Sequence, residues 1–455
     1  MTDTATIPNK VDVLHIAGFD GYDNTHESGN YIVFNALRDL DHSSCMIIHQ
    51  HKTFIDDMTF LKPMPWVCNP MRSSARPSPQ EIAKMLPSHK VLVLYGADYT
   101  PEELRAIYDE HQCQIIYVLM VHDLFSGGCS YPNAPDLVKI IPTPHHPQGN
   151  WIANDWARDP SIPLPPELDL DPRSIMCDGY TKNCGNCPQI SDSSLEDSSR
   201  QLMEAKKKYL SDVPIIIAGV SSYSLTLVPN SSIFSGNRTV LLPIPNDIPY
   251  CAESKQEVRK MAGLPVEKKV MLWGTTSPYV LRKGRNLIDE VFKYMWDLMS
   301  PEERSNTVVL NVGPVPPKPL SQSQPFQVAN TGYLKTRQQM AMAYKMADIG
   351  FSTTTSDAGP MMVSESLRNE CPLISFDRSV AGDMVVNGKT GYLVKNLDTK
   401  EMADRALELL RSPNLEEISK NCPSAVKQYH NFENVTLKWK KLLDEFILEG
   451  EPDAS

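Results

Sequence analysis

Short apolar runs alternate with amphipathic stretches along most of the 455-residue chain. The apolar runs have the length of strands, and the stretches between them have the spacing of helices that bury one face. Alternation of this kind predicts parallel sheets covered by helices. We expect strands at residues 11–17, 45–49, 90–95, 114–121, 213–219, 269–273, 307–312, 349–352 and 373–376, and helices at residues 31–40, 206–210, 286–298, 337–347, 363–369, 400–410 and 434–448.

The alternation is interrupted at two places. Residues 130–176 contain Pro, His and Trp with little periodicity, which indicates a long loop or insert. At residues 241–250, prolines and an Asn-Asp pair stop regular structure. We therefore expect an N-terminal domain (1–243), a C-terminal domain (244–428) and a final helical segment (429–455). A chain of this length suits two domains, and ligands bind at the carboxyl ends of the strands in open parallel sheets.

Composition and charge exclude several classes of protein. The net charge is -11, whereas affinity for nucleic acid comes from clustered Lys and Arg, so no nucleic-acid partner is expected. No apolar run reaches the length of a membrane helix, and the first ten residues contain no signal-peptide core. We therefore expect a cytoplasmic protein, in which the ten Cys are reduced or metal-bound.

Two acidic residues flank the start of a predicted helix in the C-terminal half. Asp357 precedes Pro360, which is preorganised for a first helical turn, and Glu365 lies one turn further on. Gly359 permits close approach of the backbone, and free amides at a helix N-terminus favour a phosphate. Glu365 is placed to accept hydrogen bonds from two ribose hydroxyls. The alternative is a solvated acidic helix start, which is common.

Three further motifs stand out by their positions. Arg282-Lys283-Gly284 follows the strand at 269–273 and precedes a helix. His122-Asp123 follows a buried strand and is continued by Gly127-Gly128-Cys129. Cys177, Cys184 and Cys187 form a Cys-x6-Cys-x2-Cys pattern after the proposed insert.

Taken in order, these segments resemble glycosyltransferase family 4, and in particular its bacterial exopolysaccharide (colanic-acid-type) subgroup. The resemblance extends from about residue 11 to residue 448 and is weakest at the start and across the insert. It implies the GT-B fold, in which two Rossmann-like, doubly wound domains face a cleft. The C-terminal helix is then expected to pack back on the N-terminal domain.

The resemblance also implies an activity. A retaining hexosyltransferase of this family moves a hexose from a nucleoside-diphosphate sugar, such as UDP- or GDP-hexose, to an acceptor hydroxyl. The acceptor is a glycan, a lipid-linked sugar or another hydroxyl compound, and peripheral membrane contact is compatible with this chemistry. The leaving phosphate takes the acceptor proton, so neither a protein nucleophile nor a catalytic metal is required.

Roles for the C-terminal residues follow from the same resemblance. Arg282 and Lys283 would hold the donor diphosphate and stabilise the charge that builds on it. Glu365 would bind the ribose, and Asp357 would contact the donor sugar. The turn at Tyr333 would read the nucleobase through its backbone, although Tyr333 is equally well explained as a packed strand residue.

His122 is the candidate from the N-terminal half. A histidine at the carboxyl end of a parallel strand faces the crevice, where it hydrogen-bonds a sugar hydroxyl or stabilises charge. A lone histidine is otherwise more often structural. Asp123 either orients His122 or caps the next turn.

The resemblance extends to four cysteines, Cys129, Cys177, Cys184 and Cys187. A Cys-x2-Cys pair with two more thiols suits a tetrahedral structural zinc site, and thiolates favour zinc over calcium or magnesium. The alternatives are two disulfides or buried thiols.

Several glycines of the family are replaced in this chain. In the first strand-to-helix loop, Gly21 and Gly29 only partly replace the Gly-Gly-Ala motif of the family. Gly29 is the candidate for contact with the donor phosphates. Ser379-Val380 replaces a Gly-Gly pair, and Glu370 replaces a glycine before Cys371. These changes suggest an alternative function, a non-catalytic nucleotide-sugar-binding or scaffold protein.

Overall fold

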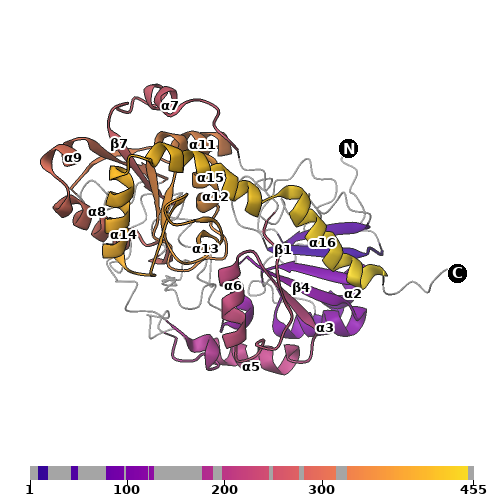
Figure 1. Ribbon diagram of the computed structural model, residues 1–455. Coiled ribbons are helices and arrows are strands. Elements are labelled where there is room, and N and C mark those ends of the chain that lie inside the picture. The colour runs from indigo at the N-terminus through magenta and orange to yellow at the C-terminus, as the bar shows by residue number, and fades with distance from the viewer. Residues whose placement is uncertain are drawn as a thin grey trace.

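The computed structural model describes residues 9–18, 42–49, 78–96, 99–120, 122–127, 177–187, 197–244, 249–275, 281–313 and 325–448. Within these ranges the chain forms two six-stranded sheets, one from each half of the sequence, in separate lobes (Figure 1). Every strand pairing in both sheets is parallel. The expected α/β fold of two Rossmann-like domains is confirmed.

The N-terminal sheet has the strand order β2-β1-β3-β4-β5-β6. Its strands are β1 (Val13–Gly18), β2 (Ser44–His49), β3 (Val91–Tyr95), β4 (Gln114–Leu119), β5 (Ile215–Gly219) and β6 (Thr239–Leu241). The helices of this half are α2 (Pro79–Met85), α3 (Pro101–His111), α5 (Ser199–Leu210) and α6 (Ser222–Leu227), with short 3-10 turns η2 (Asp123–Phe125), η5 (Gly179–Thr181) and η6 (Val228–Asn230).

The C-terminal sheet has the order β12-β11-β10-β7-β8-β9. Its strands are β7 (Lys269–Gly274), β8 (Thr307–Val312), β9 (Gln327–Asn330), β10 (Ile349–Ser352), β11 (Leu373–Phe376) and β12 (Gly391–Val394). Around it lie η7 (Leu281–Lys283), α7 (Lys255–Met261), α8 (Arg285–Leu298), α9 (Pro301–Ser305), α11 (Arg337–Met346), α12 (Met361–Arg368), α13 (Ala381–Met384), α14 (Thr399–Arg411) and α15 (Leu415–Tyr429).

The order of the C-terminal strands creates a topological switch point. From β7 the chain first adds β8 and β9 on one side, and then returns to add β10, β11 and β12 on the other. The loops that follow β7 and β10 therefore diverge at the carboxyl edge of two neighbouring strands. A switch point of this kind is where open α/β sheets bind ligands.

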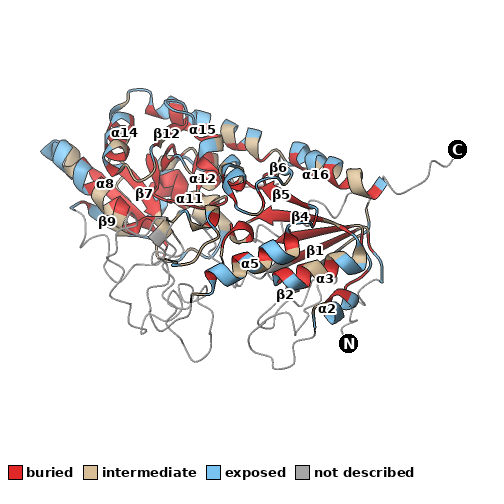
Figure 2. Ribbon diagram, turned by 90° about the horizontal axis from the view of Figure 1, so that it is seen from below, coloured by how far each residue is buried: buried red, intermediate tan, exposed pale blue. Residues whose placement is uncertain are grey.

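Local sequence explains where the main elements begin and how they pack. Thr100, Ser254 and Thr336 each form a capping box with the residue three positions later, which fixes the start of α3, α7 and α11. Alternate residues of each central strand face opposite layers of helices, and both faces are buried. Figure 2 shows these buried strands between helices whose outer faces are exposed. Continuous apolar strands are typical of parallel sheets covered on both sides.

The last helix, α16 (Phe432–Ile447), lies on the N-terminal sheet and not on its own domain (Figure 1). Trp439 is fully buried in a cluster with Val93, Ile116 and Ala218 of three N-terminal strands. The Lys90 ammonium also donates to the Ile447 carbonyl at 2.7 Å. The predicted return of the C-terminal helix to the first domain is confirmed. In the described ranges, no helix has the length and apolarity needed to span a membrane.

The structure contains elements that the apolar pattern does not predict. The strands β6, β9 and β12 have three or four residues and lie at sheet edges, and part of each strand is not fully buried, so each gives only a weak apolar signal. Pro423 lies inside α15, where a proline normally argues against a helix. The predicted helix at residues 31–40 lies outside the described residues.

Candidate functional site

The basic pair Arg282-Lys283 is held against the loop that follows the neighbouring strand β10. The Thr355 amide donates to the Arg282 carbonyl at 2.8 Å, and the Thr353 hydroxyl donates to the Lys283 carbonyl at 2.9 Å. Gly284 has a φ of 71°, and a Cβ there would lie 2.2 Å from the Thr353 carbonyl oxygen. The close approach of the two loops therefore requires glycine at position 284.

Both cations converge on one carboxylate. The Arg282 guanidinium and the Lys283 ammonium bind the same oxygen of Asp357, the latter at 2.6 Å. Burial alone would raise the pKa of Asp357, but Lys283 and Arg282 outweigh it and hold that pKa well below its usual range. Asp357 is therefore ionised, and the three side chains together carry one net positive charge at the switch point.

His122 follows β4 and is completely buried. Its Nε2 lies 2.9 Å from the Ser224 hydroxyl of α6, and its ring stacks on Phe125 with centroids 5.9 Å apart. Burial is the main reason that the pKa of His122 is lowered to about 4. The charge of Asp357 raises this pKa by a smaller amount, and the charge of Arg282 lowers it. Contacts through Ser224 and Ser221 to the Ala358 carbonyl place His122 of the first domain near the charged cluster of the second.

The turn after His122 is held by two residues that the sequence patterns do not single out. The Tyr117 hydroxyl of β4 donates to the Asp123 carboxylate at 2.7 Å. The buried Lys206 of α5 donates to the carbonyls of Asp123 and Ser126, the latter at 2.8 Å. A buried ammonium that satisfies two carbonyls fixes the path of this turn.

The two domains touch beside this cluster. The Ser221 hydroxyl donates to the Ala358 carbonyl at 2.5 Å. The Ser222 amide donates to the Asp383 carboxylate at 3.0 Å, and the Tyr429 hydroxyl also lies 3.1 Å from that carboxylate. The loop after β5 therefore contacts the C-terminal domain directly, next to Asp357.

Glu365 lies in α12, whose N-cap is Pro360, as expected for a helix that this proline opens. The buried hydroxyl of Tyr344 in α11 hydrogen-bonds the Glu365 carboxylate. Burial, reinforced by Glu365, raises the pKa of Tyr344 well above its usual value. Tyr344 is thus a neutral donor that orients Glu365, and sequence reasoning did not identify it.

Tyr333 follows β9 and leaves 53% of its surface exposed. The alternative that Tyr333 is a packed strand residue is therefore wrong. The neighbouring residues Thr331 and Leu334 help to line a pocket of about 280 Å³ between β9 and α11. The turn at Tyr333 is thus presented at the carboxyl edge of the sheet, on the β8–β9 side of the switch point.

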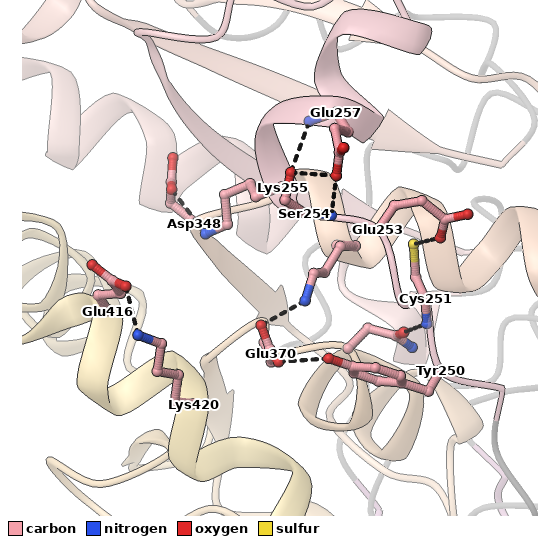
Figure 3. Close-up of polar contacts among 12 residues, drawn as sticks. Tyr250, Cys251, Glu253, Ser254, Lys255, Glu257, Asp348, Glu370, Glu416 and Lys420 are labelled. Carbon is pink, nitrogen blue, oxygen red and sulfur yellow. Dashed lines mark hydrogen bonds and ion pairs between the residues drawn. The ribbon is translucent and has the colours of Figure 1, made fainter.

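Two of the replaced glycines retain the backbone conformation that glycine favours. Glu370 has a φ of 58° and Ser379 a φ of 56°, both in the left-handed region. The Glu370 carboxylate accepts from the Tyr250 hydroxyl at 2.8 Å (Figure 3) and from the Lys345 ammonium at 2.6 Å. At these two positions, the backbone keeps a left-handed conformation without glycine.

Three of the four candidate zinc ligands fall in the described residues. Cys177, Cys184 and Cys187 are half-buried. The Gly179 amide donates to the Cys177 sulfur at 3.3 Å, and the Gly127 amide to the Cys184 sulfur at 3.2 Å. In the part of the chain that the structure describes, no three His, Cys, Asp or Glu side chains meet as a metal site. Cys129, Gly29 and the insert at 130–176 lie outside that part.

Comparison with known families matches one part of the chain. Residues 320–426 match the family described as glycosyl transferases group 1. The matched segment contains Tyr333, Asp357 and Glu365, so this region is similar to that family. A comparison with curated proteins gave no match.

Comparison with solved structures extends over nearly the whole chain. Sucrose-phosphate synthase from Thermosynechococcus elongatus has 13% identity and a TM-score of 0.61, and the alignment covers 96% of this chain and 100% of that one. Anabaena HepE, solved with UDP and glucose, has 12% identity and a TM-score of 0.58 over 95% and 100%. A glycosyltransferase from Rickettsia africae has 11% identity and a TM-score of 0.59 over 98% and 100%. At such identities the similarity establishes the two-domain fold alone.

Proposed function

We propose that this protein is a retaining glycosyltransferase that moves a hexose from a nucleoside-diphosphate sugar to an acceptor hydroxyl. The observation that carries the proposal is the convergence of Arg282, Lys283 and Asp357 at the switch point between β7 and β10. Two fixed cations at such a place suit a diphosphate, which carries the negative charge to match them. The group 1 match and the UDP complex of HepE support a nucleotide-sugar donor.

The donor is assigned to the residues along this edge. Arg282 and Lys283 hold the diphosphate, Glu365 binds the ribose, and the turn at Tyr333 receives the nucleobase. Asp357 contacts the transferred sugar, and His122 approaches that sugar from the opposite domain. The donor would thus extend from the pocket beside β9 toward the contact between the domains.

In the proposed reaction the bond between the sugar C1 and the β-phosphate oxygen breaks, and its electron pair passes to the phosphate. Arg282 and Lys283 stabilise the charge that develops there. The acceptor oxygen bonds to C1 on the same face, and its proton passes to the departing phosphate. The two cations supply the positive charge that the leaving group needs, so the proposal assigns no catalytic metal.

We also propose a structural zinc held by Cys129, Cys177, Cys184 and Cys187. The Gly179 and Gly127 amides donate to the sulfurs of Cys177 and Cys184, as amides do to metal-bound thiolates. Without a metal, burial and the neighbouring Cys177 and Cys187 raise the pKa of Cys184, so a bound cation would be needed to hold its thiolate. The metal would link the start of the insert to η5. This zinc has no part in the transfer reaction.

The proposed function is tested by removing one cation. Lys283→Ala should lower turnover by roughly 10²–10³-fold, the cost of losing one preorganised group that stabilises transition-state charge. Product formation with a set of UDP- and GDP-sugars measures it, and circular dichroism checks the fold. Near parental turnover in Lys283→Ala would exclude the assignment. Absence of donor hydrolysis and transfer in the parent, despite nucleotide binding, would favour the scaffold alternative.

A further inference from the structure

A chain of hydrogen bonds joins His122 of the first domain to a backbone carbonyl of the second. His122 Nε2 lies 2.9 Å from the Ser224 hydroxyl, which lies 3.1 Å from the Ser221 hydroxyl. The Ser221 hydroxyl in turn lies 2.5 Å from the Ala358 carbonyl oxygen. All four residues are at least 99% buried, so water does not compete for these contacts.

The number of protons fixes the direction of the chain. Three contacts need three hydrogens, and the two serine hydroxyls supply only two. The carbonyl of Ala358 accepts only, so the Ser221 hydroxyl must donate to it. The Ser224 hydroxyl must then donate to Ser221. The remaining hydrogen, between Ser224 and His122, can only come from the histidine, which therefore carries its proton on Nε2.

The opposite tautomer leaves a contact without a hydrogen. If Nε2 were the acceptor, the Ser224 hydroxyl would donate to it, and the Ser221 and Ser224 oxygens would face each other at 3.1 Å with no proton between them. Both hydroxyls would still donate their hydrogens, and the Ser221 oxygen would still accept from the Ser224 amide, but the two hydroxyl oxygens would repel each other, which costs more at low dielectric. The Nε2–H tautomer is accordingly favoured.

We propose that Ser224 and Ser221 are positioning residues that hold His122 in its Nε2–H tautomer through the Ala358 carbonyl of the opposite domain. This inference rests on the proposed function and adds to it. With the proton on Nε2, Nδ1 carries the lone pair and would accept a hydrogen bond from a hydroxyl of the donor sugar in a conformation that opens the ring, fully buried here, to the donor. His122 then reads the sugar as a neutral acceptor and does not stabilise charge on the leaving phosphate.

The chain also couples the tautomer to the contact between the domains. Ala358 directly follows Asp357, and Ser221 precedes α6, so separation of the domains removes the acceptor that directs both serines. Burial lowers the pKa of His122 to about 4, so the ring is neutral at pH 7 and has a single proton to place. The tautomer of His122 is therefore fixed only where the two domains meet.

The tautomer can be measured without any activity. The full chain, labelled with ¹⁵N in its histidine rings, gives long-range proton–nitrogen spectra that distinguish Nε2–H from Nδ1–H, and His122→Gln assigns the signal. We expect Nε2–H in the parent. Ser221→Ala frees the Ser224 proton to donate to Nε2 and should shift His122 toward Nδ1–H. Ser222→Ala, which changes an exposed neighbour in the same helix, should leave the spectrum unchanged.

The kinetic part uses donor, acceptor and the same variants. Ser221→Ala and Ser224→Ala should lower kcat roughly 3- to 10-fold, the scale of one misdirected neutral hydrogen bond, with unchanged affinity for the free nucleoside diphosphate. Ser224→Thr, which keeps the hydroxyl, should restore both kcat and the spectrum. An Nδ1–H signal in the parent, or an unchanged signal in Ser221→Ala, overturns the inference. A parent without transfer activity but with the expected spectra would count against the proposed function alone.

Discussion

At the residue scale, the acidic groups of the site owe their orientation to buried neighbours. Glu365 is held by the hydroxyl of Tyr344, which burial keeps neutral. Asp357 is held by two cations, whose charges keep it ionised. Each carboxylate is thus fixed before any ligand arrives, which lowers the ordering cost of binding.

The ribose assignment of Glu365 predicts a loss of ground-state binding. Glu365→Ala should weaken binding of a nucleoside diphosphate by roughly 1.5–3 kcal/mol, the value of hydrogen bonds to a charged group. Tyr344→Phe should weaken this binding less, by about 0.5–1.5 kcal/mol, because it removes only the hydroxyl that orients the Glu365 carboxylate. Calorimetry with UDP and GDP measures both. His122→Ala is the control and should bind the free diphosphate as the parent does, whereas parental affinity in Glu365→Ala would rule out the ribose role.

The left-handed residue Ser379 predicts an unusual effect of glycine. A non-glycine residue at a φ of 56° is strained by about 1 kcal/mol, and Ser379 is almost fully buried. Ser379→Gly should therefore raise the free energy of unfolding by roughly 0.5–1 kcal/mol. Ser379→Ala keeps the strain and serves as the matched control in urea unfolding. A Ser379→Gly variant that is no more stable than Ser379→Ala would show that the position is not strained.

At the element scale, parallel strands align loops that are distant in sequence. The loops after β7 and β10 meet because the strands are neighbours, although Lys283 and Asp357 lie 74 positions apart. Gly284 lets the first loop approach the carbonyl of Thr353, so the cations face the carboxylate at hydrogen-bonding distance. Helices α11 and α12 then add Tyr344 and Glu365 to the same domain.

The cysteine segment around η5 predicts a bound metal. Protein made in reducing cells should contain about one zinc per chain by elemental analysis. Removal of the metal by a chelator should lower the melting temperature, because binding energy of a structural zinc contributes to folding. Cys184→Ser should lose the metal, whereas Cys113→Ser, at a buried cysteine of the first domain's core, should keep it. Metal-free parent protein with free thiols would refute the site.

At the scale of the whole molecule, the two domains are joined by more than the connecting segment. Helix α16 buries Trp439 in the first domain, and the Ser221–Ala358 and Ser222–Asp383 contacts join the loop after β5 to the second. His430, just before α16, bridges Ser364 of α12 at 2.7 Å and the Ile244 carbonyl at 2.8 Å. The residues that we assign to the donor in the two domains are therefore linked by direct contacts between the domains.

The stability of the molecule should depend on pH through buried histidines. Burial lowers the pKa of His15 to about 3, and those of His89 and His122 to about 4, from 6.5. The unfolded chain therefore takes up these protons near pH 6.5, whereas the folded chain does not. The three buried neutral histidines therefore contribute fully to stability above pH 6.5. As the pH falls toward 4, the free energy of unfolding drops by about 1.4 kcal/mol per histidine per pH unit.

This dependence is measured by urea unfolding at several pH values between 7 and 4. The free energy of unfolding should fall steadily over this range. His122→Gln, which cannot take up the proton, should reduce the slope by about 1.4 kcal/mol per pH unit. Ser222→Ala should retain the parental slope. An equal slope in His122→Gln and the parent would mean that His122 titrates normally in the folded protein.

The sequence by itself determined the class of fold. A strand buried on both faces must be a continuous apolar run, and the residues that cap a helix lie next to its start, so both kinds of element can be recognised locally. Most strands and the helix that Pro360 opens were predicted in this way, whereas the return of α16 and the roles of Arg282, Asp357 and Glu365 were implied by the family resemblance. The short edge strands β6, β9 and β12 were not predicted, since strands of three or four residues that are not fully buried give only a weak apolar signal.

Only the tertiary structure decided which groups act on one another. It placed Arg282 and Lys283 on the same oxygen of Asp357, brought Tyr344 to Glu365 and joined His122 to Ala358 through two serines. Tyr344, the two serines and the Ala358 carbonyl have no sequence pattern of their own, because such groups are common throughout the chain. Their roles arise from the strand order and from the contact between the domains. Both bring together atoms that are far apart along the chain, and no repeating sequence pattern marks such pairs.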